Sequence, residues 1–89
     1  MEGFKLKILT PVGVVLEEEN VTSVSVPSSE GEIGILPGHV KYSGLLGTGI
    51  LKYNSNSSKP HKVSVSEGFC NFSDNELVIL ADKAELQAA

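Results

Sequence analysis

The sequence predicts a small all-β domain, a sandwich or flattened barrel of short antiparallel strands. Hydrophobic and polar residues alternate strictly in three separate segments, and clusters of Gly, Pro, Asn, Asp and Ser separate the segments at short intervals. Strict alternation is the pattern of a strand with one packed face and one face in water. Many such strands divided by turns are typical of sandwiches and barrels.

The first two strands are predicted at the N-terminus. Phe4–Ile8 alternates, and Thr10–Gly13 contains the Pro and Gly of a hairpin turn. The turn leads into a less regular strand at Val14–Glu19. The charge run Glu17–Glu19 at its end is interpreted as a solvated sheet edge that discourages edge-to-edge pairing.

Further strands are expected along the rest of the chain. They are Thr22–Val26, the short run Ile33–Leu36, Ile50–Tyr53, Lys62–Ser66, Phe69–Phe72 and Leu77–Leu80. Asn54–Pro60 is interpreted as a hairpin loop, and Ser73–Glu76 as a polar turn. Gly44, Gly47 and Gly49 are interpreted as part of a turn that enters Ile50–Tyr53.

The last nine residues differ from the rest in composition. Ala81–Ala89 consists of helix formers, and Asp82 with Glu85 three positions later resembles a capping box. We therefore expect a β domain over residues 1–81 and a short helical stub at 82–89, where a helical region would begin.

Composition excludes several classes of protein. The 89 residues form one domain of 9.4 kDa with a net charge of −4. All seven basic residues are Lys, so no guanidinium is present to contact phosphate or guanine, which argues against nucleic acid as a partner. No apolar run approaches the roughly 20 residues of a membrane span, and Met1-Glu2 does not begin a signal peptide. The single Cys70 cannot form an internal disulfide, which fits a reducing compartment.

No catalytic or metal-binding constellation is predicted. His39 and His61 have no Cys or second His at ligand spacing, and no phosphate-binding loop occurs. Cys70 lies in an apolar strand and is expected to be a small buried residue. We therefore expect no enzymatic activity, no metal and no cofactor.

The segment Glu30–His39 is unusual because it places three glycines and a proline around a short apolar run. Taken alone, it fits either a tight structural loop or a loop that binds a partner. The carboxylates of Glu30 and Glu32 would share one side of a strand, but nothing in the sequence would bury one of them and raise its pKa.

The extended segment Val24–His39 resembles the N-terminal domain of the epsilon subunit of bacterial F-type ATP synthase, called delta in mitochondria. Its most specific part is the string Glu-Gly-Glu-Ile-Gly-Ile-Leu-Pro-Gly-His. The resemblance covers residues 4–85. It includes Phe4–Leu9, Gly49–Lys52, Val65–Phe69 and Val78–Asp82.

The resemblance implies a flattened two-sheet β-sandwich of about ten strands. It also implies a non-catalytic rotor subunit that links gamma to the membrane-embedded ring, couples proton flow to ATP synthesis, and lies peripherally at the cytoplasmic face of the cell membrane. Glu32 matches the ring-facing loop and His39 a gamma-facing position. The residues that match as shaping this loop are Gly31, Gly34, Pro37 and Gly38.

The sequence departs from the family pattern in three places. Val40-Lys41 replaces a common Ala-Pro, and Glu67 replaces the first glycine of a common Gly-Gly-Phe. The family's C-terminal helical hairpin has no counterpart, so we expect neither the braking of ATP hydrolysis nor the ATP binding that the hairpin supports. The alternative function is a free-standing adaptor or small-ligand-binding domain, since a β-sandwich alone does not define function.

Overall fold

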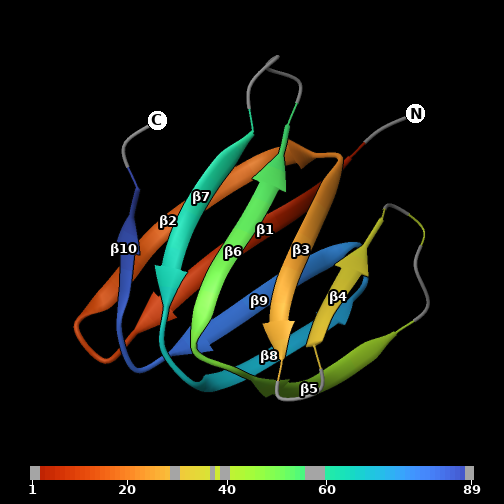
Figure 1. The fold of residues 1–89 in the computed structure, drawn as a ribbon. Coiled ribbons are helices and arrows are strands. Elements are labelled where there is room, and N and C mark those ends of the chain that lie inside the picture. Colours follow the sequence, from red (N-terminus) through yellow and green to blue (C-terminus); the bar gives the residue numbers. More distant parts are fainter. Residues whose placement is uncertain (1–2, 29–30, 37, 39–40, 56–59, 88–89) are drawn as a thin grey trace.

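The computed structural model describes residues 3–28, 31–36, 38, 41–55 and 60–87, and these form two five-stranded sheets packed face to face (Figure 1). The first sheet has the order β2 (Gly13–Val21), β1 (Phe4–Thr10), β9 (Glu76–Ala81), β8 (Gly68–Ser73) and β5 (Tyr42–Leu46). The second has the order β10 (Ala84–Leu86), β7 (His61–Val65), β6 (Gly49–Asn54), β3 (Ser23–Ser28) and β4 (Gly31–Ile35). The predicted two-sheet β-sandwich is confirmed.

The core lies between the sheets because alternate residues of β1, β3, β6, β7, β8 and β9 point inward. In β1, Phe4, Leu6 and Ile8 are at most 2% exposed. The Phe4 and Phe72 rings meet edge to face across the first sheet, with centroids 5.3 Å apart. Among the described residues every fully buried side chain is hydrophobic. The hydrophobic positions of the alternating segments are therefore the buried ones, as predicted.

Two predicted turns have the expected local chemistry. Asp74 and Asn75 have φ of 50° and 60°, the left-handed conformation that both central residues of a type I′ hairpin adopt. In the β1–β2 turn the backbone N–H of Val12 donates to Thr10 Oγ1 at 3.3 Å. Both hairpins are specified by residues within the turns themselves.

The strand β5 was not predicted. The turn interpretation holds for Gly47, but Gly44 lies inside the strand, opposite Cys70 of β8. A Cβ on Gly44 would lie 2.7 Å from the Tyr42 hydroxyl oxygen, so the glycine leaves room for that ring. Glycine therefore serves packing here, not a turn.

The predicted helical stub is wrong for Ala84–Leu86, which form β10. This strand pairs antiparallel with β7, from Ala84 opposite Val65 to Leu86 opposite Val63. A short isolated helix is marginal in water, whereas pairing with β7 satisfies backbone groups on both strands. Tertiary pairing therefore overrides helix propensity.

One pairing is parallel, between β1 and β9, although antiparallel strands were expected throughout. Lys5 lies opposite Glu76 and Leu9 opposite Leu80, so the β1–β2 turn and the end of β9 occupy the same end of the sandwich. At this end the Gly47 N–H donates to the Pro27 carbonyl at 2.9 Å, which ties the β5–β6 connection to the end of β3. We call this the Glu32 end, because β4 begins there with Gly31 and Glu32.

Candidate functional site: an apolar row across the first sheet

Five apolar side chains form a continuous row on the outer face of the first sheet. The registers place Leu45 of β5 opposite Phe69, Phe69 opposite Leu80, Leu80 opposite Leu9, and Leu9 opposite Val14. We call these five residues the apolar row. With strands about 4.8 Å apart, the row is about 19 Å long.

The apolar row is exposed where an outward face is normally polar. Leu45 is 70% exposed, Val14 55%, Leu80 47% and Phe69 41%, while Leu9 is half-buried. Single exposed apolar residues are common, but a contiguous set that crosses a whole sheet marks an interaction surface. The described residues therefore include one clear candidate for a protein-binding face.

Polar residues border the apolar row on both sides. The neighbouring row away from the Glu32 end contains the polar residues Ser43, Asn71, Lys7 and Glu17, with the apolar Val78 between Asn71 and Lys7. Lys7 Nζ lies 3.9 Å from Glu17 Oε2 there. On the side of the Glu32 end, the Asp82 N–H donates to the Glu67 carbonyl at 3.3 Å, which extends the β8–β9 ladder by one step. Glu67 and Asp82 are therefore cross-strand neighbours beside the apolar row.

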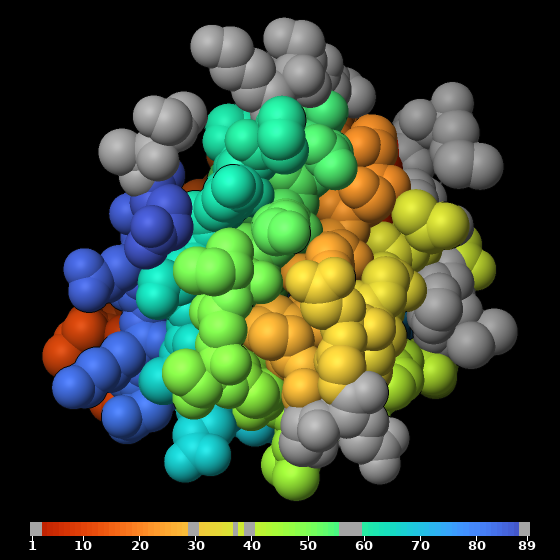
Figure 2. Space-filling view, in the orientation of Figure 1, coloured from red at the N-terminus to blue at the C-terminus, as the bar shows by residue number. Residues whose placement is uncertain are grey.

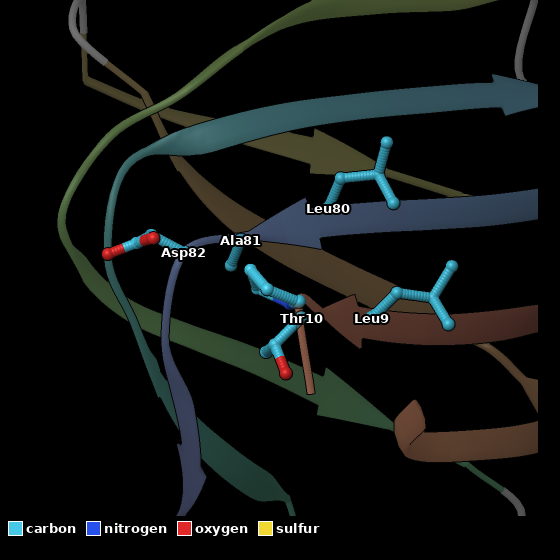
Figure 3. A pocket seen from close by; sticks show the side chains of 6 residues that line it. Leu9, Thr10, Leu80, Ala81 and Asp82 are labelled. Atoms are coloured by element: carbon cyan, nitrogen blue, oxygen red, sulfur yellow. The ribbon is translucent and has the colours of Figure 1, made fainter. Parts of the chain in front are cut away.

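Two open pockets lie between the apolar row and this carboxylate border. One, of about 390 Å³, is lined by Leu9, Thr10, Pro11, Leu80, Ala81 and Asp82 (Figure 3). Figure 3 shows Leu9 and Leu80 on adjacent strands, with Asp82 beyond the end of β9. The other pocket, of about 370 Å³, is lined by Leu45, Leu46, Gly47, Glu67 and Gly68.

The residues predicted from sequence lie elsewhere. Glu32 is exposed in edge strand β4 of the second sheet, opposite Pro27. It follows Gly31, which has φ +112° and whose carbonyl accepts a hydrogen bond from Ser28 Oγ at 2.5 Å. Gly34 lies within β4 opposite Ser25, and Gly38 has φ +78°.

Two further predicted residues, Pro37 and His39, lie outside the described residues. The structure does not bring Glu32 into the apolar row. In the sequence, His39 precedes β5, which contains Leu45, by three residues.

The titratable groups with shifted pKa values are structural. Burial raises the pKa of the Cys70 thiol, and a backbone hydrogen bond with Gly44 opposes the shift. Burial, and secondarily the Glu18 charge, raise the pKa of Tyr53. The Tyr53 ring stacks on the His61 ring, with the two ring centroids 4.9 Å apart. Among the described residues no group of three His, Cys, Asp or Glu side chains is placed to hold a metal. The described part of the chain also has no helix able to span a membrane.

Comparison with known proteins decides the family. The family described as "ATP synthase, Delta/Epsilon chain, beta-sandwich domain" matches residues 3–87. The chain therefore belongs to this ATP synthase delta/epsilon family. The resemblance inferred from the Glu30–His39 segment is confirmed.

Curated relatives agree with this membership. An ATP synthase epsilon chain of Nitratidesulfovibrio vulgaris is 45% identical over 84 residues, which are 94% of this chain and 61% of the relative. The epsilon chain of Desulfitobacterium hafniense is 43% identical over 92% of this chain and 61% of the relative. This delta/epsilon chain thus spans about three fifths of the length of the curated relatives it matches.

Solved structures share the fold. A chain of the Euglena gracilis mitochondrial ATP synthase OSCP/F1/c-ring assembly superposes with a TM-score of 0.88 and 25% identity, covering 97% of this chain and 54% of that one. A chain of the Tetrahymena thermophila mitochondrial ATP synthase central stalk and c-ring superposes with a TM-score of 0.77 and 16% identity, over 91% and 64% of the two chains.

Sequence reasoning missed the apolar row, although a local signal was present. Leu77–Leu80 and Leu45-Leu46 are apolar at consecutive positions, so both faces of those strands are hydrophobic. A strand with one face in water alternates hydrophobic and polar residues, so a continuous apolar run indicates a strand that is covered on both faces. The register that joins these positions into one row depends on strand order, which the pattern does not contain.

Proposed function

We propose that this chain is a non-catalytic rotor subunit of an F-type ATP synthase. In this proposal the apolar row binds the gamma subunit, and the Glu32 end faces the membrane-embedded ring. The chain thereby transmits rotation between ring and gamma and couples proton flow to ATP synthesis, at the cytoplasmic face of the membrane. The observation that supports this best is an exposed apolar row on a rigid domain of the delta/epsilon family.

The apolar row suits a permanent partner because it would be costly to leave in water. The two pockets beside the row are open and do not enclose a site for a small molecule. Burying large side chains such as Phe69 and Leu80 removes apolar area from water, which is the main favourable term in protein association. A subunit that must transmit torque needs this kind of extended contact on a stiff sheet.

The Glu32 end suits a second partner because Glu32 lies on the second sheet, whereas the apolar row lies on the outer face of the first sheet. Glu32 is exposed on edge strand β4, and the sheet-to-sheet connections 47–48, 66–67 and 82–83 gather at the same end (Figure 1). We propose Glu32 as a ring contact, with Gly31, Pro37 and Gly38 shaping its segment. Gly34 was expected to shape the segment too, but it has neither a positive φ nor a close neighbour that would exclude a side chain. We propose His39 as a gamma contact, because it precedes β5 in the sequence.

Binding to gamma is tested by one substitution in the apolar row and one matched control. Leu80→Lys places a charge in the row, while Ile50→Lys changes an aliphatic residue that is 37% exposed in β6 of the second sheet. Figure 2 shows the outer side of that sheet, where β7, β6, β3 and β4 lie side by side. We expect Leu80→Lys to weaken binding to a gamma-containing catalytic complex by at least about tenfold and Ile50→Lys to leave the Kd unchanged. Equal effects would refute the assignment.

The ring contact is tested by reversing one charge. Glu32→Lys should reduce ATP-driven proton pumping in reconstituted membranes while binding to gamma and the melting temperature stay unchanged, since exposed substitutions change stability by less than about 0.5 kcal/mol. Glu85→Lys is the matched control, because Glu85 is exposed on β10, the opposite edge strand of the same sheet. Normal coupling with Glu32→Lys would exclude Glu32 from the contact.

A further inference from the structure

We infer that the pocket between Leu9 and Leu80 binds an arginine side chain of the partner, with its stem on the two leucines and its guanidinium at Asp82 (Figure 3). This rests on the proposed function, because the pocket adjoins the apolar row and shares Leu9 and Leu80 with it. It adds the chemical identity of one partner residue, to which nothing in the family match refers.

The shape of the pocket favours a long side chain with an apolar stem and a polar head. Asp82 follows Leu80 by two residues and lies in the bend just after β9, at the end of the pocket beyond the two leucines (Figure 3). Leu9 widens the apolar floor from the neighbouring strand, where it lies opposite Leu80. Arginine matches this layout because its methylenes cover apolar surface while its head remains at a polar rim.

The charges favour a cation at that rim. Asp82 is the one charged residue that lines the pocket, and its N–H donates to the carbonyl of Glu67 just beyond the last ladder pair of β8 and β9. Two carboxylates on backbone neighbours repel each other. Within the described structure the ion pair is Lys7–Glu17, on the other border of the apolar row, and Lys83 forms none with Asp82. A guanidinium placed beside the two carboxylates would neutralise their repulsion.

Guanidinium fits better than ammonium at this position. Its planar fork can donate two parallel hydrogen bonds to one carboxylate, and it is more weakly hydrated, so it packs on apolar side chains at lower cost. Arginine is also among the residues that dominate binding energy at protein interfaces. The pocket is therefore expected to be the place where the apolar row gains specificity for its partner.

The test compares two isosteric substitutions on exposed aspartates. Asp82→Asn removes the rim charge, and Asp74→Asn is the matched control in the β8–β9 turn, at the opposite end of the first sheet. We expect Asp82→Asn to weaken binding to the gamma-containing complex by about 10-fold or more at low salt and to flatten its salt dependence. The Asp74→Asn chain should have the same Kd and the same salt dependence of binding as the wild type. Bound wild-type chain should also protect one partner arginine from phenylglyoxal, and Asp82→Asn chain should not.

The outcomes separate this inference from the proposed function. If Leu80→Lys abolishes binding but Asp82→Asn leaves the Kd and salt dependence unchanged, the apolar row binds the partner without an arginine in this pocket. If binding weakens but no arginine is protected, no partner arginine occupies the pocket and the inference is wrong. If the wild-type chain does not bind the complex at all, the proposed function itself fails.

Discussion

Gly68 is the position where the structure predicts the largest effect of a single added methyl group. It begins β8 and lies opposite Ala81 of β9, between Glu67 and Phe69 of the candidate site. A Cβ at Gly68 would lie 1.9 Å from the Leu80 carbonyl oxygen and 2.9 Å from Ala81 Cα. Both are backbone atoms of a central strand, so no side-chain rotation relieves the overlap.

The overlap can be converted into a free energy of unfolding. Restoring an ordinary contact requires β8 and β9 to move apart by about 1.5 Å, which breaks one or two ladder hydrogen bonds worth about 1 kcal/mol each. Strain of about 1–3 kcal/mol in the surrounding core adds to this. Gly68→Ala should therefore destabilise the domain by about 2–5 kcal/mol, which lowers the melting temperature by about 10–40 °C for a chain of this size.

Gly34→Ala is the matched control, because Gly34 lies in edge strand β4 with no atom within 4 Å of a built Cβ. It should change stability by less than about 0.5 kcal/mol. Thermal melts followed by far-UV circular dichroism compare the two variants, and the wild-type spectrum should be that of a β protein without helix. A Gly68→Ala chain that melts within about 3 °C of wild type would refute the reasoning.

Three further predictions concern single residues. Gly38 has φ +78°, so Gly38→Val should cost about 1–2 kcal/mol, and an unchanged urea midpoint would contradict this. Leu77 is 0% exposed, so Leu77→Ala should cost about 2–5 kcal/mol in the same assay. Burial raises the pKa of Cys70 above its ordinary 9.0, so the folded state prefers the neutral thiol. The contribution of the buried neutral thiol to the free energy of unfolding is complete below the ordinary pKa and is lost as the pH rises through the folded pKa. The melting temperature should therefore fall at alkaline pH, and it should fall less steeply in Cys70→Ala. Equal slopes would exclude the thiol as the cause.

Local features could be predicted because their causes lie within a few residues. The inward face of β1 follows from the period of two in Phe4–Ile8, and the β8–β9 turn follows from the tolerance of Asp74 and Asn75 for positive φ. The family could also be inferred, because Glu30–His39 is a specific string.

Features that depend on partners distant in sequence could not be predicted. β5 contains Gly44, a strand breaker by composition, and it exists because β8 pairs with it. Ala84–Leu86 is helix-forming by composition, and it is a strand because the edge of β7 is available to it. In both segments a hydrogen-bonding partner outweighs intrinsic propensity.

The sequence by itself determined the strand class, the inward face of each alternating strand, the hairpin turns and the family. Only the tertiary structure decided which outward-facing residues are neighbours. Leu45, Phe69, Leu80, Leu9 and Val14 come from five strands, and their order across the sheet depends on a parallel pairing between β1 and β9 that joins the two ends of the chain. A period of two specifies which side of a strand a residue occupies, but not which strand lies beside it, because register is set by packing of the buried face. The apolar row and the pocket at Asp82 are consequences of that packing.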